Sequence, residues 1–377
     1  MSGPAASPRL ATESELVDWD ARTVTVPGGH AYQSRAWAQQ RARLGWAPLH
    51  VVIDDDHRAL VLVRRAPLVG SASAYVPRGP VAADEDRSAA ARVATLADWL
   101  AREHGVDVLA TDAEVPAGDA SYGRALVAAG FQPIPEIQPS RHRISLAIPP
   151  GTDDAAVRSG VTKSTRQRFD RAERDGIVVT RFDAGGWSGD GHDAGPLFAT
   201  PPVGALDAAL AGFADLLTAT GARRGFRFGP RGVFIDWWRA AHGAGMLVYL
   251  AAHDPAVPER TLGGLLLYRH GDRLSTVHSG DAEGVRDSHP GVMHLLRWRG
   301  IQLAIREGRS EMDLGGVDVG PDHAEPAEGT PMAGLYEHKR SFGASWVAMT
   351  GAHERVARPW RAQAARVTTR LARAVRR

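Results

Sequence analysis

The sequence contains no cysteine among its 377 residues. Disulfide frameworks, thiolate zinc sites, iron–sulfur clusters and a cysteine nucleophile are therefore all excluded. The absence of cysteine also fits a protein that works in a reducing cytosol.

Long hydrophobic runs are absent as well. The first sixteen residues hold no apolar stretch of signal-peptide length, and the longest apolar stretches, Met246–Ala252 and Leu265–Tyr268, fall far short of the ~20 residues that span a bilayer. We therefore expect neither a secreted nor a membrane-spanning protein. With 44% hydrophobic residues, the composition is that of a globular protein, and the length suggests two domains with a cleft between them.

Several catalytic and nucleotide-binding motifs are also missing. The sequence has no GxxxxGK[ST], GxGxxG, HExxH or GxSxG string, and His353-Glu354 lacks the second histidine of a zinc motif. Its histidines are scattered, so we expect no metal site and no serine-hydrolase chemistry.

Lysine is nearly absent. Of the 45 basic residues only Lys163 and Lys339 are lysine, and the others are arginine. An ammonium group is a compact charge whose pKa shifts readily on burial, which a guanidinium does not offer. The two lysines are therefore informative positions, and at least one of them is a candidate functional residue.

The order of predicted elements repeats. The first half is predicted to contain a helix, a hairpin, a helix, a strand, a short helix and a strand, at Arg35–Leu44, Leu49–Ile53 with Ala59–Ala66, Ser88–His104, Val106–Ala110, Ser121–Ala129 and Arg143–Ile148. The second half is predicted to contain three strands, a helix and a short strand, at Met246–Ala252, Leu262–Arg269, Leu274–Ser279, Pro290–Glu307 and up to Leu314. The shared strand–strand–helix–strand order predicts two α/β domains of one kind, 1–150 and 151–344.

Three segments lie outside this repeat. Arg166–Arg174 is predicted to be a charged helix with a solvated face, and the Gly-, Asp- and Pro-rich stretch 184–204 a long loop, either a lid or an insertion. Glu354–Arg377 carries eight arginines against a single acid and is predicted to be a basic amphipathic helix. Such a helix packs on its own protein, lies on an anionic membrane surface or contacts nucleic-acid phosphate.

Several segments together resemble the Fem family of aminoacyl-tRNA-dependent transferases of peptidoglycan synthesis. They are Gln33–Trp37 with Leu44–Trp46, Val76–Val81, Gly130–Pro133 with Ile137–Pro139, Arg166–Gly176, Leu295–Gly308, Asp313–Gly316 and Gly334–Gly343. Each segment is a weak signal alone, but their order and spacing extend from His30 to Gly343.

The resemblance implies two tandem acetyltransferase-like (GNAT) domains, with the C-terminal segment 345–377 returning to the first. The long helical arm that some members insert is not expected here. The implied reaction transfers an amino acid from aminoacyl-tRNA, as co-substrate and without a cofactor, to the peptide stem of a UDP-linked or lipid-linked muropeptide precursor. The implied location is the cytoplasm, with 354–377 as a segment for peripheral contact with the inner face of the membrane.

Coenzyme A enzymes of this fold usually carry Q/R-x-x-G-x-G/A to cradle the pyrophosphate. Here R-x-x-G begins at Arg102, Arg260, Arg297 and Arg340, and in each case the last position is neither Gly nor Ala. This pattern favours an acyl donor other than coenzyme A.

By the same resemblance Lys339 is expected to stabilise the oxyanion of the transferred acyl group, a task that suits a compact ammonium. Relatives often have an aromatic residue just before this lysine, whereas this chain has His338, which would line the donor site or shuttle a proton. Phe342 lies in the same segment and is expected to contact substrate.

The remaining candidates are expected to handle the acceptor. Asp112 follows a strand and would orient or deprotonate the amine, or else cap the next turn. Arg41 and Arg231 would bind the phosphates of the precursor, and Arg78 is either a phosphate ligand or a turn residue. His278 takes the place of a tyrosine near the acceptor in relatives, and Asp281 lies three residues later.

Two other functions remain open from the sequence. One keeps the fold but makes the chain a coenzyme A-dependent N-acyltransferase or a tRNA-dependent ligase of secondary metabolism. The other is a protein that binds tRNA or the precursor without catalysis.

Overall fold

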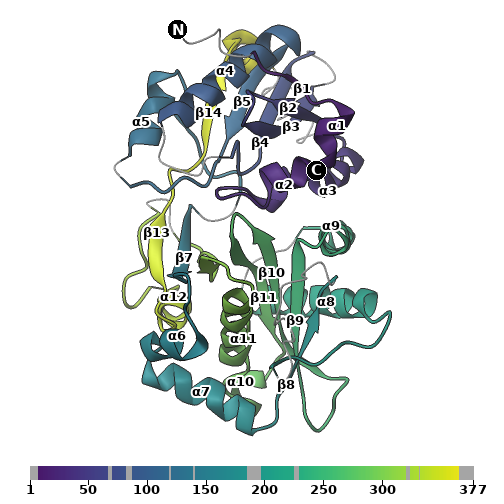
Figure 1. Cartoon of the computed structure of the whole chain (residues 1–377), viewed down its shortest axis with the longest axis vertical. Coiled ribbons are helices and arrows are strands. Elements are labelled where there is room, and N and C mark those ends of the chain that lie inside the picture. The colour runs from purple at the N-terminus through teal and green to yellow at the C-terminus, as the bar shows by residue number, and fades with distance from the viewer. Residues whose placement is uncertain are drawn as a thin grey trace. The chain divides into compact units, whose positions relative to one another are not determined.

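The computed structural model describes residues 7–66, 70–81, 87–118, 120–138, 141–184, 197–224, 229–319, 323–330 and 332–364 (Figure 1). They belong to two compact units, Met1–Arg141 with Val347–Arg377, and His142–Trp346. Each unit contains one seven-stranded sheet with helices on both faces. The predicted α/β class with two tandem domains is confirmed.

The sheet of the first unit has the order β1-β2-β3-β4-β5-β14-β6. Its strands are β1 (Arg9–Leu10), β2 (Ala47–Val52), β3 (Arg58–Arg65), β4 (Ala72–Val76), β5 (Val106–Thr111), β6 (Gln132–Pro133) and β14 (His353–Val356). β2 and β3 form the predicted hairpin, and β4 runs parallel to β5. A parallel pair requires a crossover, which the helix between β4 and β5 supplies.

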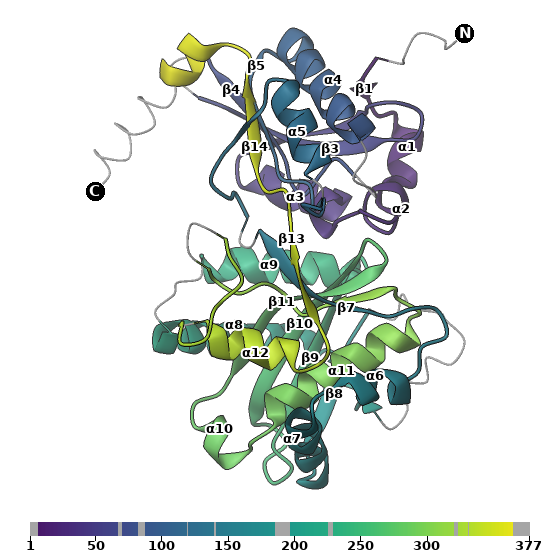
Figure 2. The same ribbon diagram turned by 90° about the vertical axis from the view of Figure 1, so that its left-hand side faces the viewer.

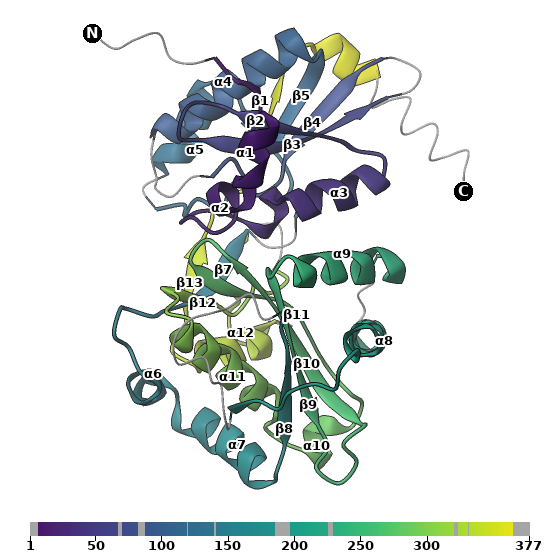
Figure 3. The same ribbon diagram turned by 45° about the vertical axis from the view of Figure 1, so that its right-hand side comes forward.

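Helices cover both faces of this sheet (Figure 3). They are α1 (Glu13–Val17), α2 (Trp19–Thr23), the 3₁₀ turn η1 (Ala31–Gln33), α3 (Arg35–Arg43), α4 (Arg87–Glu103) and α5 (Ser121–Ala128). α4 and α5 pack on one face and α1 to α3 on the other. Val93, Leu96 and Leu100 of the crossover helix α4 are fully buried at helical spacing, which is why the sequence predicted this helix correctly.

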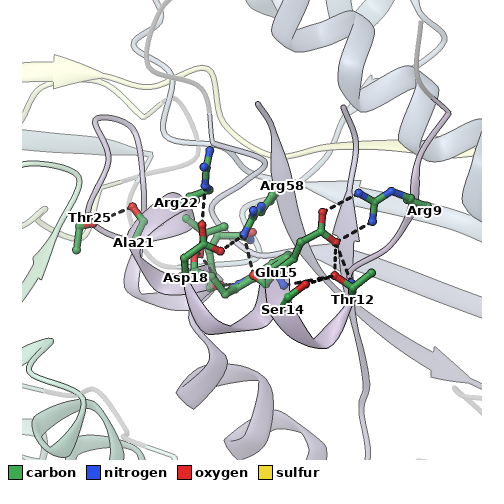
Figure 4. A network of polar contacts seen from close by, with 12 residues as sticks. Arg9, Thr12, Ser14, Glu15, Asp18, Ala21, Arg22, Thr25 and Arg58 are labelled. Atoms are coloured by element: carbon green, nitrogen blue, oxygen red, sulfur yellow. Dashed lines mark hydrogen bonds and ion pairs between the residues drawn. The ribbon is translucent and has the colours of Figure 1, made fainter. Parts of the chain in front are cut away.

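A polar network holds the N-terminal helices of the first unit in place (Figure 4). Thr12 caps α1 through a capping box with Glu15, whose carboxylate also pairs with Arg9 at 2.6 Å. Arg58 of β3 donates to the Glu15 carbonyl and to the Asp18 carboxylate, both at 2.7 Å. These contacts attach α1 to the edge strand β1, and they attach α1 and the start of α2 to β3.

The sheet of the second unit has the order β13-β7-β12-β11-β10-β9-β8. Its strands are β7 (His142–Ala147), β8 (Val178–Phe182), β9 (Leu247–His253), β10 (Thr261–His270), β11 (Arg273–Asp281), β12 (Glu311–Asp313) and β13 (Ser345–Ala348). β11 and β12 run parallel, and the β9–β10–β11 meander is antiparallel.

The helices of the second unit are α6 (Asp154–Gly160), α7 (Lys163–Arg174), α8 (Leu206–Arg224), α9 (Arg231–Gly243), α10 (Val285–Ser288), α11 (Val292–Arg306) and α12 (Ala333–Arg340). α8 and α9 lie on one face of the sheet, and α7, α11 and α12 on the other (Figure 3). The crossover helix α11 packs its leucines and Ile301 on the leucines of β10. Among the described residues no helix is longer than the 19 residues of α8.

The charged helix predicted at Arg166–Arg174 is α7. It buries Phe169 and Ala172 against α11. Two of its acids are paired across the surface, Asp170 with Arg158 at 2.7 Å and Glu173 with Arg299 at 2.9 Å. The helix is therefore attached to the unit along one side.

The two sheets match strand for strand. Read from β1 and from β8, both have four strands joined antiparallel, then a fifth that is parallel to the fourth, then a sixth that comes from elsewhere in the chain. That sixth strand is β14 in the first unit and β7 in the second. Figure 2 shows β14 running beside β5, which lies far earlier in the sequence.

Because of these sixth strands, the boundaries between the two units differ from the predicted ones. The strand predicted at Arg143–Ile148 is β7, and it pairs with β12, so the second unit begins at His142 and not at residue 151. The chain returns to the first unit after Trp346. Most of the predicted loop 184–204, residues 185–196, lies outside the described residues.

The basic amphipathic helix predicted from Glu354 is wrong at its start. His353–Val356 is the strand β14, because this segment pairs with β5 and β6. Three arginines bind the first unit itself: Arg355 pairs with Asp98 at 2.7 Å, Arg358 with Asp107 at 3.1 Å, and Arg361 donates to the Gly70 carbonyl at 2.8 Å. Trp360 is 75% exposed, and residues 365–377 lie outside the described part.

Candidate functional site

The carboxyl ends of the two parallel strand pairs are equivalent points in the two units. In open α/β sheets, ligands bind outside the carboxyl ends of the strands, where neighbouring segments diverge. In the first unit, Asp112 comes directly after the carboxyl end of β5. In the second unit, the Lys339 side chain contacts the backbone just after the carboxyl end of β12. The last paired residues are Val76 with Thr111 and Ser275 with Asp313.

In the first unit this point is closed by hydrogen bonds. The Asp112 carboxylate accepts from the Arg78 backbone N–H at 2.7 Å and from the Tyr75 hydroxyl at 2.8 Å. The Thr111 hydroxyl donates to the Gly79 carbonyl. Asp112 is 1% exposed, and burial raises the pKa of its carboxyl group. Oδ1 therefore holds the loop that follows β4, and Oδ2 holds Tyr75 of β4 itself. The sequence offered Asp112 as a cap of the turn after its own strand, whereas these hydrogen bonds go to the neighbouring strand and its loop.

Arg78 is buried in the same loop. Its guanidinium lies 3.8 Å from the Asp112 carboxylate and 3.7 Å from that of Glu114. Its backbone is left-handed, with φ of 48°. Its charge is balanced inside the unit, as expected for the turn residue that the sequence offered as one alternative.

Arg41 presents a different environment. Its guanidinium lies 4.9 Å from the ring centroid of Trp37 and 5.9 Å from that of Trp46, and Arg64 lies 5.4 Å from the Trp46 ring. Within the described residues neither arginine forms an ion pair, and burial lowers the pKa of Arg41. Two guanidinium groups beside one indole form a surface that suits an anion, and sequence reasoning missed Arg64 because only the fold brings β3 beside α3.

In the second unit, the equivalent point is occupied by Lys339. Its side chain comes from α12 and is 4% exposed. The Nζ atom donates to the carbonyl oxygens of Gly315 at 2.8 Å and Gly316 at 2.6 Å. An ammonium has three N–H groups. Described residues accept hydrogen bonds from only two of those on Lys339. The third position on Nζ is free of described protein acceptors.

The loop that binds Lys339 requires glycine. Gly315 has φ of +76°, and a Cβ added there would lie 2.7 Å from the Thr276 carbonyl oxygen. Its N–H donates to the Asp313 carboxylate at 2.8 Å. The left-handed turn after β12 thereby directs two successive carbonyls toward one ammonium group.

The charges around Lys339 act in opposite directions. Burial is the largest influence and lowers the pKa of Lys339; Arg297 lowers it further, and Asp313 raises it. Lys339 therefore gives up a proton more readily than an exposed lysine does.

His338 is held in a chain of side chains. Arg297 Nε donates to His338 Nε2 at 2.8 Å, and His338 Nδ1 lies 3.1 Å from His294 Nε2. Since an arginine N–H can only donate, the proton of neutral His338 is on Nδ1 and points to His294. Burial lowers the pKa of His338 strongly and that of His294 to about 4. Both nitrogens of His338 are engaged, so in this conformation it positions its neighbours and has no free nitrogen for shuttling a proton.

Phe342 is fully buried next to this chain. Its ring lies edge-on to that of His338, with 5.7 Å between centroids. His338 and Phe342 thus pack on each other next to Lys339, and the substrate contact expected of Phe342 stays a prediction.

The other predicted residues of the second unit lie on β11 and α9. His278 packs edge-on against Phe234, 5.7 Å away, and burial lowers its pKa to about 4. Asp281 ends β11 and pairs with Arg223 at 3.2 Å and Arg286 at 2.8 Å. Arg231 is exposed and pairs with Asp215 at 2.8 Å, so this arginine ties α9 to α8.

No metal site is apparent in the part of the chain that the structure describes. There, no three His, Asp or Glu side chains are grouped to hold a metal ion. None of the helices described combines the length and hydropathy needed to cross a membrane.

The structure is similar to several solved structures. The crystal structure of FemX superposes with a TM-score of 0.73 over 93% of this chain and 97% of that chain, at 17% identity. The chain has the fold of FemX. The predicted resemblance to the Fem family is therefore confirmed for the fold.

Two further structures align over most of the chain. L-PGS from Bacillus licheniformis has a TM-score of 0.50 and 9% identity over 95% of this chain and 97% of that one. A conserved protein of unknown function from Bacteroides thetaiotaomicron VPI-5482 has a TM-score of 0.51 and 12% identity over 92% and 98%. No protein-family model and no curated protein matches the sequence.

Proposed function

We propose that this chain, which shares its fold with FemX, is an aminoacyltransferase. It takes an amino acid from aminoacyl-tRNA and transfers it to an amine on the peptide stem of a peptidoglycan precursor, without a cofactor. The observation that carries the proposal is the buried Lys339 ammonium, anchored on two carbonyls with its third position free of described acceptors.

The reaction is the aminolysis of an ester. The neutral amine of the acceptor attacks the aminoacyl carbonyl, which forms the new C–N bond and leaves an oxyanion. The third N–H of Lys339 stabilises that oxyanion, because a fixed donor in a site that excludes water needs no reorganisation as the charge develops. The C–O bond to the 3′ oxygen of the tRNA then breaks.

The lowered pKa of Lys339 allows the same side chain to donate a proton to the leaving group and to accept one from the attacking amine. The ammonium gives its third proton to the departing 3′ oxygen and becomes a neutral amine. That amine then takes a proton from the nitrogen that has been acylated, which restores the ammonium. One side chain can perform both steps because burial and Arg297 bring its two protonation states closer in energy.

The acceptor is proposed to bind through its phosphates to the first unit. Arg41 and Arg64, arranged around Trp46, carry charges that no described carboxylate neutralises. Arg231 would have to leave Asp215 before it could bind a phosphate. We therefore assign the phosphates to Arg41 and Arg64.

A coenzyme A donor is disfavoured by the start of α11. Pyrophosphates bind readily at helix N-termini, and α11 is the crossover helix of the parallel pair. A methyl group on its N-cap, Gly291, would lie 2.2 Å from the Arg168 carbonyl oxygen. The positive end of α11 thus faces a backbone oxygen of α7, and no pyrophosphate motif precedes it.

A transfer assay tests this function. Radiolabelled aminoacyl-tRNA, as a mixed pool, is incubated with UDP-linked pentapeptide and separately with its lipid-linked form in detergent, and labelled acetyl coenzyme A is the alternative donor. Label moving from tRNA to either precursor supports the proposal and identifies the acceptor. Label arriving only from acetyl coenzyme A, or binding of tRNA with no transfer, refutes it in favour of one of the other two functions.

A further inference from the structure

The peptide group between Gly316 and Val317 is bound at both ends. Its carbonyl oxygen, on Gly316, accepts from Lys339 Nζ at 2.6 Å. Its N–H, on Val317, donates to His142 Nε2 at 3.0 Å. One peptide plane therefore links the candidate catalytic lysine to a histidine of β7, which neither sequence motif nor resemblance had singled out.

His142 is held rigidly. It is 3% exposed, and its ring stacks on Trp346 with 3.8 Å between centroids and 12° between planes. Because a backbone N–H can only donate, Nε2 is unprotonated and the proton is on Nδ1. Burial lowers the pKa of His142 to about 4, so it stays neutral near pH 7 and remains an acceptor.

We propose that His142 is a positioning residue for Lys339, acting through the Gly316–Val317 peptide. By accepting the Val317 N–H it fixes the orientation of the Gly316 carbonyl. It also polarises that carbonyl, because hydrogen bonds in a chain strengthen one another. The role of this contact in catalysis rests on the proposed function, but its effect on Lys339 does not.

The expected effect has a definite sign. A polarised carbonyl favours the ammonium form of Lys339, so loss of the His142 acceptor should lower the pKa of Lys339. Among the described residues, the other charged or titratable groups that act on Lys339 or His142 are Arg297 on α11, Asp313 on β12, His338 on α12 itself and His323. These groups remain in place when only His142 is changed.

The small number of lysines makes the test direct. Selective labelling with ¹³C,¹⁵N-lysine gives two side-chain signals, from Lys339 and from Lys163, which is exposed on α7 of the same unit. The ¹³Cε shift of each is followed against pH. His142→Phe keeps a ring for Trp346 but has no acceptor, and His142→Gln offers a side-chain carbonyl in its place.

We expect the Lys339 midpoint to fall by about half a pH unit or more in His142→Phe and to recover in His142→Gln. Lys163 should be unaffected. An unchanged Lys339 midpoint in a folded His142→Phe protein would overturn the proposal. Should that variant fail to fold, the amide proton shift of Val317 in Lys339→Met decides: an upfield shift supports the coupling, and no change refutes it.

Activity is measured separately. In an active wild-type protein, His142→Phe should lower kcat about 10- to 100-fold with KM unchanged, and His142→Gln should recover most of it. A wild-type protein that transfers no amino acid would refute the proposed function while the NMR result still decides the role of His142. A loss of kcat in His142→Phe without any change in the Lys339 titration would mean that His142 only maintains the local structure. That result would contradict the inference.

Discussion

Replacing Gly315 by alanine should damage the lysine anchor selectively. Gly315 has φ of +76°, and the new methyl group would lie 2.7 Å from the Thr276 carbonyl oxygen. Because that oxygen belongs to the backbone of β11, it cannot rotate away as a flexible side chain could. The loop must shift, and the two carbonyls that hold Lys339 shift with it.

The magnitude follows from two contributions. A left-handed alanine costs about 1–2 kcal/mol, and overpacking of a tight site typically costs about 1–3 kcal/mol more. Gly315→Ala should therefore lower the free energy of unfolding by about 2–5 kcal/mol. Gly329 is a matched control in the same unit, since it has φ of +83° and nothing within 4 Å of an added Cβ. Gly329→Ala should incur only the first cost, so its free energy of unfolding should fall by about 1–2 kcal/mol.

Urea unfolding of both variants, followed by tryptophan fluorescence and circular dichroism, measures the difference. At low urea, where both variants are folded, the ¹³Cε signal of Lys339 should move in Gly315→Ala and remain in place in Gly329→Ala. Equal destabilisation of the two variants, together with an unmoved Lys339 signal, would refute the account of this loop.

Two further predictions concern the first unit and the C-terminal segment. Burial raises the pKa of Asp112 above 3.8, so its contribution to stability is present below about pH 4 and is lost as the pH rises through the folded-state pKa. Relative to Asp112→Asn, the wild type should therefore lose stability in urea titrations between pH 4 and pH 7, and parallel pH profiles would contradict this. Residues 365–377 contain five arginines, each worth about 1 kcal/mol near an anionic bilayer, so their deletion should abolish co-sedimentation with anionic vesicles. Equal sedimentation of the shortened chain would exclude this segment as a membrane contact.

The elements that the sequence predicted well are those fixed by local patterns. α4 shows apolar residues at helical spacing and ends before Gly105, and the β2–β3 hairpin has Asp54–Asp56 as its turn. β4 was missed because Ala72–Val76 is short and rich in small residues. α8 was missed because its apolar residues form no distinct stripe.

Features that depend on pairing between distant segments could not be predicted in this way. β14 lies at the start of the segment from Glu354 that was predicted to be an amphipathic helix, because apolar residues further along it have helical spacing. Pairing with β5 makes His353–Val356 a strand. β7 belongs to the second sheet only because it pairs with β12.

The same division applies to the candidate site. Lys339 was found because lysine is nearly absent from the chain and because its segment resembles a known family. Arg297, His294 and His142 were missed, since each gains its role from a contact with a residue far away in sequence. A buried histidine gives no local signal of the peptide group that it binds.

The central claim is that Lys339 carries the acyl transfer, and single-turnover kinetics test it most directly. Transfer from aminoacyl-tRNA to the precursor is compared for the wild type, Lys339→Met and the control Lys163→Met, which removes the other, exposed lysine. Loss of one oxyanion donor should slow Lys339→Met about 100- to 1,000-fold, with Lys163→Met as fast as the wild type. Transfer by a folded Lys339→Met protein at the wild-type rate would contradict the account.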